Sequence, residues 1–143
     1  MLRIERARDG DLDAVRRLLA AHHLPLDGLD DHVTTLLVAR QDDIVVGAAA
    51  LEVYRDGALL RSLAVAAELR GRGLGRDLTD AAIRMARELD VAALYLLTTT
   101  AERFFPKFGF QRIERGDVPP SVRESVEFRS ACPASAVVMA KTL

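Results

Sequence analysis

The sequence predicts an α/β fold built on a mixed sheet, and two observations lead to it. Apolar, strand-like runs at 36–39, 44–54 and 58–65 follow one another with short turns between them, which is the order of antiparallel hairpins. The last run is followed by a glycine-rich turn, an amphipathic stretch at 74–89 and another apolar run at 91–97. A strand, a helix and a second strand in this order form a right-handed βαβ unit, whose two strands are parallel.

Length, charge and cysteine content narrow the class of protein. The 143 residues predict one domain, which we place at 1–143. The formal net charge of −1 gives no general basic field, so nucleic acid is not an expected partner. One cysteine cannot form an internal disulfide and fits a reducing, cytoplasmic compartment. The chain starts without an apolar signal region, and no run approaches the ~20 apolar residues of a membrane span, so no membrane partner is expected.

The segment before the hairpins predicts a strand at 2–6 and a helix that runs from Asp9, its N-cap, to about Ala21. Pro25 and Gly28 indicate that a loop follows this helix. The spacing of the apolar residues in the helix is that of one buried face. This face comprises Leu12, Val15, Leu18 and Leu19.

Polar residues inside the apolar strands are informative. Glu52 interrupts the long central strand, and Arg61 and Ser62 lie in the middle of the next one. A carboxylate inside a sheet should be paired or desolvated, so Glu52 has either a chemical role or a structural one. The structural alternatives are an ion pair with Arg61 and an exposed strand end. Gly47, in the same central strand, indicates a bulge or a close contact.

The turn at 70–75 predicts a binding site for phosphate or pyrophosphate. It joins a strand to a helix, so several backbone N–H groups at the helix start lack intrahelical partners, and the helix dipole adds partial positive charge there. Glycine allows a ligand to approach the backbone closely, and Arg70, Arg72 and Arg76 add full charges. The structural alternative is a glycine-rich turn with a solvated basic rim.

Two well-known phosphate motifs do not fit this turn. The pattern Gly-x-x-x-x-Gly-Lys-Ser/Thr is absent. The dinucleotide fingerprint Gly-x-Gly-x-x-Gly fails because the third glycine, Gly75, falls one residue early after Gly71 and Gly73. That fingerprint also belongs to the first strand of its domain, whereas this turn lies in the middle of the chain.

The helix after the turn has a clear apolar stripe, and capping signals mark two further helices. Thr99 and Glu102 form a capping box that predicts a short helix, which Gly109 ends. A second capping box predicts a helix at 121–128, and a final strand is expected at 136–140. The stripe comprises Leu74, Leu78, Ala81, Ala82, Met85, Ala86 and Leu89.

The turn resembles the coenzyme A loop of the GNAT acetyltransferases. Arg70, Gly73 and Gly75 match its pattern Arg/Gln-x-x-Gly-x-Gly/Ala position by position, and a short helix that closes on Gly109 and Phe110 is a second hallmark. The resemblance covers 44–113. It implies a mixed, mostly antiparallel sheet with a splayed parallel pair, flanked by about four helices. It also implies acetyl-CoA as cofactor, no metal, and direct transfer of the acetyl group to an amine.

The resemblance further implies how the coenzyme is bound. Its pantetheine arm would lie between the strands 59–65 and 91–97, and the backbone of Leu63 and Val65 would pair with its amides. Phe104 and Phe105 have core packing as a structural alternative. The implied cofactor-binding residues are Leu63, Ala64, Val65, Arg70, Gly71, Arg72, Gly73, Leu74, Gly75, Arg76, Thr98, Phe104 and Phe105.

For catalysis, the resemblance favours Glu52 as general base, with a backbone N–H near Val65 polarising the thioester carbonyl. Many family members have a tyrosine four residues before the glycine of the Gly-Phe pair, and this tyrosine protonates the leaving thiolate. Here that residue is Phe105, which has no proton to donate. Either the thiolate leaves without an acid or another group substitutes for the tyrosine. The candidate substitutes are Ser62, Tyr95, Ser130 and Cys132.

In such folds the first helical region borders the acceptor site, so the histidines at 22, 23 and 32 are candidates for contact with substrate, with solvated loop histidines as the alternative. They show no metal-ligand spacing. Arg129, which precedes the C-terminal strand, is suited to bind a carboxylate of the substrate through two hydrogen bonds. The alternative is a structural salt bridge. The predicted substrate-binding residues are His23, Arg61, Thr99, Arg129 and Ser130.

A narrower resemblance rests on the runs 59–65 and 95–100 and on the tail of the chain. They are similar to the GNAT proteins associated with bacterial arsenic-resistance operons, which implies a small amino compound, such as an amino-acid-like arsenical, as acceptor. Two alternatives stay open: an acetyltransferase for peptide N-termini or lysine, and a non-catalytic acyl-CoA sensor. Dimers are common in the family, so a homodimer is a candidate state.

Overall fold

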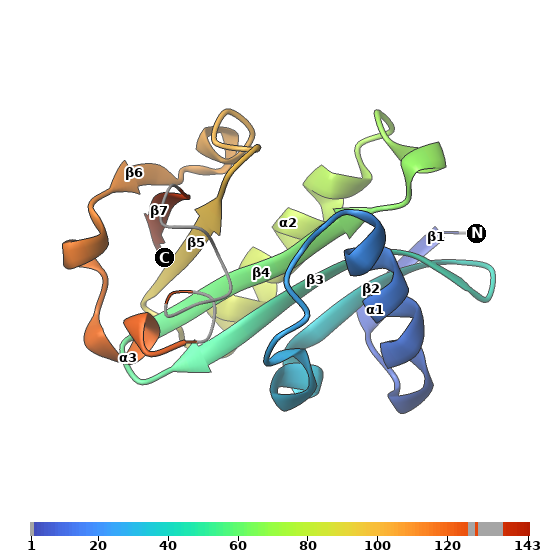
Figure 1. Cartoon of the computed structure of the whole chain (residues 1–143), viewed down its shortest axis with the longest axis horizontal. Coiled ribbons are helices and arrows are strands. Elements are labelled where there is room, and N and C mark those ends of the chain that lie inside the picture. Colours follow the sequence, from blue (N-terminus) through green and yellow to red (C-terminus); the bar gives the residue numbers. More distant parts are fainter. Residues whose placement is uncertain (1, 126–127, 129–135) are drawn as a thin grey trace.

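A computed structural model describes residues 2–125, 128 and 136–143. Within these residues the chain forms a seven-stranded sheet with the order β1-β2-β3-β4-β5-β7-β6 (Figure 1). Neighbouring strands are antiparallel except for β4 and β5, which are parallel. This confirms the expected mixed sheet. The strands are β1 (Leu2–Arg6), β2 (Leu36–Gln41), β3 (Ile44–Tyr54), β4 (Gly57–Val65), β5 (Ala93–Thr98), β6 (Gln111–Ile113) and β7 (Val137–Thr142).

Helices cover both faces of the sheet, with α1 in front of it and α2 behind it in Figure 1. Consecutive residues of β3 point to opposite faces, so Ala48 packs in the cluster under α1, whereas Ala49 packs in the cluster under α2. This explains why β3 is apolar along most of its length. The described helices are α1 (Leu12–Ala21), α2 (Leu74–Glu88) and α3 (Pro120–Arg123), with 3₁₀ turns η1 (Asp9–Asp11), η2 (Leu29–Thr35), η3 (Ala67–Leu69), η4 (Phe105–Phe108) and η5 (Arg115–Asp117).

The parallel pair β4 and β5 is splayed, as expected. The two strands are paired only at their starts, where Ala58 lies opposite Leu94 and Leu59 opposite Tyr95. Beyond that point they diverge (Figure 1). Antiparallel pairing with β7 supports the free side of β5 along its whole length. The sheet is therefore open between β4 and β5 where β4 runs toward α2.

A bulge in β4 lies at the start of the splay. The partner of β3 changes from Ala64 to Arg61 within two residues, which leaves Ser62 and Leu63 outside the regular register. Ser62 has a φ of 61°, in the left-handed region that non-glycine residues rarely adopt. The bulge turns this part of the strand out of the regular ladder, next to the opening between β4 and β5.

Gly47 confirms the sequence prediction at its position. The register between β2 and β3 shifts beside it. A Cβ atom on Gly47 would lie 2.9 Å from Leu78 Cδ1 and 3.2 Å from the Ala64 carbonyl oxygen. Because those neighbours are the core of α2 and the backbone of β4, only glycine lets this helix pack so closely on the sheet.

The start of α1 and the end of α2 differ in detail from expectation. α1 begins at Leu12, one 3₁₀ turn after the predicted start at Asp9. Asp11 supplies the cap-like contact, because its carboxylate accepts the Arg8 backbone N–H at 2.8 Å. α2 begins at Leu74 as predicted, but Leu89 lies past its end and is 41% exposed, so it does not belong to the buried stripe.

The two predicted capping boxes are wrong. Thr98, and not Thr99, caps the following segment: its hydroxyl accepts the N–H of Ala101 at 2.9 Å, and the chain forms turns and then η4. The Ser121 hydroxyl donates to Asp56 Oδ2 at 3.0 Å and so ties α3 to the β3–β4 turn. Helix α3 is Pro120–Arg123, and residues 126 and 127 of the predicted helix lie outside the described residues. Gly109 does end its segment, with a φ of 93°.

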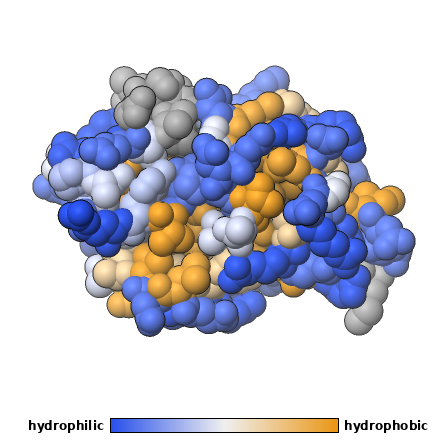
Figure 2. Space-filling view, turned by 90° about the horizontal axis from the view of Figure 1, so that it is seen from below, coloured by the Kyte–Doolittle hydropathy of each residue, from blue (hydrophilic) through white to orange (hydrophobic). Residues whose placement is uncertain are grey.

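Apolar residues reach the surface in separate patches, with hydrophilic residues between them on the face that Figure 2 shows. Among the residues that the structure describes, the most exposed large apolar side chain is that of Ile44, at 68%. None of the helices in the described part of the chain combines the length and apolar character needed to cross a membrane.

Candidate functional site

The start of α2 has the geometry of an anion-binding turn. Gly71 and Gly73 both have a φ of 81°, and nothing lies within 4 Å of the Cβ position of either residue. Glycine is therefore required by backbone conformation and not by crowding. The first N–H groups of this 15-residue helix lie directly behind Gly73. Arg70, Arg72 and Arg76 are all exposed around the turn.

A cavity of about 760 Å³, which we call the loop cavity, joins this turn to the open end of β4. It is lined by Leu63, Ala64, Val65, Arg70, Gly75, Phe104 and Thr99, together with His22, Thr100, Ala101, Glu102, Arg103 and Lys107. A recess of about 290 Å³ beside it is lined by Val65, Leu69, Arg70, Gly71, Gly73, Leu74, Gly75, Arg76 and Phe104. The loop cavity and this recess are lined by all of the predicted cofactor-binding residues except Arg72, Thr98 and Phe105.

A second cavity of about 270 Å³, the splay cavity, lies where β4 and β5 diverge. It gathers three of the predicted substrate residues: His23, Arg61 and Thr99. Ser62, Thr98 and Phe105 also line it, and Leu63 borders both cavities. The other two predicted substrate residues, Arg129 and Ser130, lie outside the described residues, as does Cys132.

Phe105 belongs to the core as well as to the cavity wall. It is 6% exposed, and its ring lies 5.1 Å from the Phe104 ring and 5.7 Å from the Phe110 ring. Phe105 therefore packs in the core, which was the structural alternative to contact with the cofactor. Phe104 packs on Phe108 at 5.1 Å and also lines the loop cavity.

Tyr95 lies apart from both cavities. It is on the part of β5 that pairs with β4, and a Cβ atom on Gly57 would meet its ring at 2.8 Å. Burial, with a smaller contribution from the negative charge of Asp56, raises the pKa of the Tyr95 phenol. A phenol that holds its proton more tightly, away from the cavity walls, is poorly suited to protonate a thiolate there.

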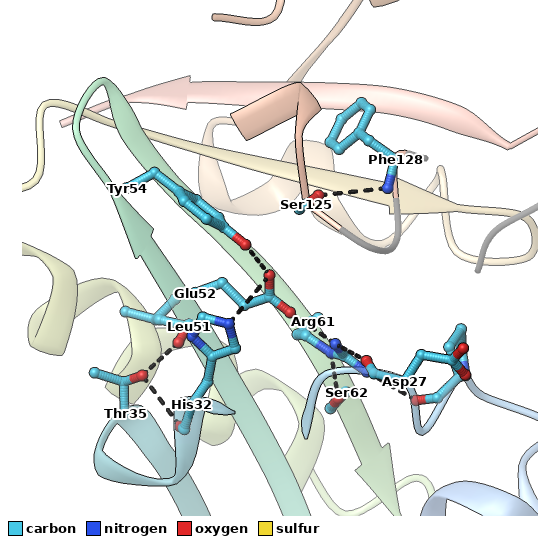
Figure 3. A network of polar contacts seen from close by, with 11 residues as sticks. Asp27, His32, Thr35, Leu51, Glu52, Tyr54, Arg61, Ser62, Ser125 and Phe128 are labelled. Atoms are coloured by element: carbon cyan, nitrogen blue, oxygen red, sulfur yellow. Dashed lines mark hydrogen bonds and ion pairs between the residues drawn. The ribbon is translucent and has the colours of Figure 1, made fainter. Parts of the chain in front are cut away.

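Glu52 and Arg61 form a buried ion pair, one of the structural alternatives that the sequence left open (Figure 3). Arg61 Nη1 donates to Glu52 Oε2 at 2.7 Å, and the two side chains are 0% and 2% exposed. The Tyr54 hydroxyl donates to the other carboxylate oxygen, and His32 Nε2 lies 3.5 Å from it. Both oxygens of Glu52 therefore have partners within the protein.

Arg61 also contacts the loop between α1 and η2. Its Nη2 donates to the Pro25 carbonyl at 2.9 Å, and its Nη1 donates to the Asp27 carbonyl at 2.6 Å. Its Nε donates to the Ser62 hydroxyl at 3.0 Å. The guanidinium thus joins β3, β4 and this loop in one hydrogen-bonded network. We call it the Glu52–Arg61 network.

The sequence did not identify one part of this site, the Tyr54 hydroxyl. Tyr54 is two residues from Glu52, on the same face of β3, and that spacing was a usable signal. Of the histidines that were candidates for substrate contact, His22 lines the loop cavity and His23 lines the splay cavity. No local pattern separates two adjacent histidines at the end of a helix. Among the described residues, no three His, Cys, Asp or Glu side chains gather as potential metal ligands.

Comparisons with known proteins agree with this geometry. The Acetyltransferase (GNAT) domain family matches residues 32–112. An amino-acid acetyltransferase of Mycobacterium tuberculosis (strain ATCC 25618 / H37Rv) is 31% identical over 129 residues, or 83% of this chain and 74% of that protein. The structure of Rv2747 from Mycobacterium tuberculosis, in complex with CoA and NLQ, has a TM-score of 0.83 and 27% identity, and the match covers 99% of each chain.

The fold is also shared with a larger enzyme. N-acetylglutamate synthase from Neisseria gonorrhoeae, complexed with coenzyme A and N-acetyl-glutamate, gives a TM-score of 0.85 at 22% identity. The match covers all of this chain but 35% of that one. This chain therefore spans about a third of the synthase, and the likeness concerns the fold alone.

Proposed function

Because this chain belongs to the GNAT acetyltransferase domain family and is an acetyl-CoA-dependent N-acetyltransferase, we propose that its acceptor is the primary amine of a small amino-acid-like molecule. The observation that carries the proposal is the 31% identity to an amino-acid acetyltransferase over 83% of this chain. A relative with 27% identity also binds CoA together with the ligand NLQ.

The loop cavity and the splay cavity share Leu63 and 99–101, so a pantetheine arm that enters from the loop cavity would end at the splay cavity. The part of the splay cavity that Leu24 and Pro25 line is then left for a small acceptor. At about 270 Å³ the splay cavity lies near the lower end of the volumes typical of small-molecule sites. Among its described lining residues none is acidic. An open groove lined by acidic residues would have favoured the alternative acceptor, a peptide N-terminus or a lysine, because those carry positive charge without a nearby carboxylate.

In the proposed binding mode, acetyl-CoA supplies an activated acetyl thioester. The amides of 70–75 bind its pyrophosphate, and the exposed Arg70, Arg72 and Arg76 add positive charge. The backbone of Leu63 and Val65 pairs with the pantetheine arm, while a backbone N–H near Val65 polarises the thioester carbonyl. As the new C–N bond forms and the C–S bond breaks, the amine loses one proton and the thiolate gains one.

Two side chains are proposed to handle these protons. Glu52 lines neither cavity and both of its oxygens have partners, so in this proposal it takes the proton of the amine through water. The Ser62 hydroxyl accepts a hydrogen bond from Arg61 Nε, so its own hydrogen is available to donate toward the thiolate. Ser62 also lines the splay cavity, which Tyr95 does not.

The experiment is an acceptor panel with detection of the thiol released from acetyl-CoA. Free amino acids are compared with their carboxamides, their N-acetylated forms and a lysine-containing peptide. We expect turnover with at least one free amino acid, and none with its N-acetylated form because that amine is already blocked. Turnover with the peptide alone would overturn the proposal.

Two finer predictions remain proposals. An arsenic-containing amino acid belongs in the panel because of the resemblance of 59–65 and 95–100 to arsenic-associated proteins. A KM for it well below those of the ordinary amino acids would support that acceptor. The homodimer is tested separately by sedimentation velocity, where a single monomeric species across the micromolar range would contradict it.

A further inference from the structure

The loop between α1 and η2 forms one wall of the splay cavity. His23, Leu24 and Pro25 line the cavity from this loop, opposite residues of β5 such as Leu97 and Thr98. The loop contains no strand, and its backbone hydrogen bonds lie at its two ends. The N–H groups of His22, His23 and Leu24 donate back to the last turn of α1, and those of Leu29 and Asp31 donate to Leu26 and Gly28 at 3.2 Å. The position of the loop over the sheet therefore depends on contacts with other elements.

Arg61 supplies such contacts from β4. It donates to the carbonyl oxygens of Pro25 and Asp27, which lie two residues apart in the loop. A guanidinium presents several N–H donors in a rigid, planar fork, so two carbonyls can be fixed at the same time. Without these donors the two carbonyl oxygens would lose their bonds to β4, and the loop would no longer be fixed at these points.

Glu52 holds this fork in place. The Arg61 side chain is 0% exposed, and its charge is neutralised by Glu52 at 2.7 Å from β3, the neighbouring strand. Figure 3 shows the guanidinium between Glu52 on one side and Asp27 on the other. Arg61 lines the splay cavity, but its guanidinium is already hydrogen-bonded to Glu52, Pro25 and Asp27. We therefore expect it to hold the loop and not the carboxylate of an acceptor.

We infer that Arg61 is a positioning residue that sets the shape of the acceptor cavity by fixing the α1–η2 loop to β4, and that it is not a ligand of the acceptor. Leu24 and Pro25 are the specificity-determining surface that it holds. The inference rests on the proposed function for the identity of the cavity as the acceptor site. It assigns Arg61 a role different from the substrate contact that the sequence predicted.

The kinetic test uses Arg61→Lys, which retains a positive charge beside Glu52 but lacks the fork. The probes are the best amino acid of the panel and its carboxamide. We expect the KM of both acceptors to rise about tenfold or more, with the KM of acetyl-CoA changed less than twofold. A rise confined to the acceptor that carries a carboxylate would overturn the inference, because it would show a direct contact. An unchanged acceptor KM would overturn it as well.

Leu24→Ala and Leu26→Ala test the wall itself. Leu24 lines the cavity, whereas Leu26 belongs to the same loop but is 40% exposed and does not line it. We expect Leu24→Ala to change the ratio of kcat/KM between a small and a large amino acid at least fivefold, and Leu26→Ala to leave that ratio unchanged. Equal effects of the two variants would contradict the inferred wall.

Hydrogen–deuterium exchange tests the fixed loop without any acceptor, so it remains decisive even if the panel finds no substrate. Amides of 23–28 should exchange at least tenfold faster in Arg61→Lys than in the wild type, while amides of α2 keep their protection. Equal exchange in the loop would overturn the inference and leave the proposed function standing. A panel without turnover, combined with faster loop exchange, would instead remove the proposed function alone.

Discussion

The loop cavity and the Glu52–Arg61 network both use β4, but they are built in opposite ways. Around the loop cavity, backbone groups of a glycine turn and exposed cations such as Arg70 border open space. In the network, buried side chains are bonded to one another. The difference teaches that a region shaped for a ligand leaves polar groups facing space, whereas polar groups that stabilise a fold are paired within it.

The largest expected effect on stability comes from a substitution that breaks the Glu52–Arg61 network. Arg61→Met should lower the free energy of unfolding by roughly 3–5 kcal/mol, because it leaves the Glu52 carboxylate buried without its ion-pair partner. Urea denaturation measures this difference. The double variant Glu52→Gln/Arg61→Met should recover much of the loss, since no unpaired charge remains. A single variant as stable as the wild type would show that the network does not stabilise the fold.

The second prediction concerns the other region. Gly73→Glu places a carboxylate at a left-handed residue in the turn, so CoA affinity should fall about 100-fold, or ~2.7 kcal/mol. Calorimetric titration with CoA, alongside thermal shift, measures it. Gly73→Ala is the matched control, because it introduces the same strain at a left-handed residue without the carboxylate. Equal CoA affinity in both variants would contradict a phosphate site at this turn.

The buried ion pair between Arg40 and Asp11 lies away from the splay and loop cavities, so it tests a paired polar group that has no part in the proposed active site. Arg40 donates two hydrogen bonds to Asp11, at 3.0 and 2.7 Å, and this hydrogen bonding lowers the pKa of the Asp11 carboxyl. A lowered pKa stabilises the folded state above the unfolded value of about 3.9, and that stability is lost as the pH falls through the folded pKa.

Asp11→Asn should therefore cost about 2 kcal/mol at pH 7 and much less at pH 3. Urea unfolding at the two pH values gives both numbers. Its kcat/KM should stay within twofold of the wild type, because Asp11 lines neither cavity of the proposed active site. A constant cost at both pH values would mean that the charge of Asp11 is not what stabilises the fold.

The smallest expected effects are on kcat, and they distinguish Ser62 from Tyr95 as the acid that protonates the thiolate. Ser62→Ala should lower kcat about fivefold to tenfold, a modest loss because a thiol with a pKa of ~8.5 leaves readily as the thiolate. Tyr95→Phe should leave kcat within twofold, since Tyr95 is away from the cavities. Steady-state kinetics at saturating acetyl-CoA measures both. A larger loss in Tyr95→Phe than in Ser62→Ala would reverse the assignment.

The sequence predicted the regular elements well where the signal is local. β3 and the start of α2 were placed at the residues where the structure has them, because alternation, helical spacing and a glycine turn act over a few neighbouring residues. The three-residue strand β6 was missed, since Gln111–Ile113 has too few residues to show any period. The capping boxes failed because distant groups competed for the same side chains, as Asp56 does for Ser121.

By itself, then, the sequence determined the α/β class, the splayed strands implied by the family resemblance, and the turn before Leu74. Only the tertiary structure decided that Glu52 pairs with Arg61 and that Arg61 reaches the carbonyls of Pro25 and Asp27. The partners of Arg61 are 9, 36 and 34 residues away along the chain. Such contacts depend on strand register, on the bulge at Ser62 and on how the first helix packs on the sheet, and none of these can be read from local spacing.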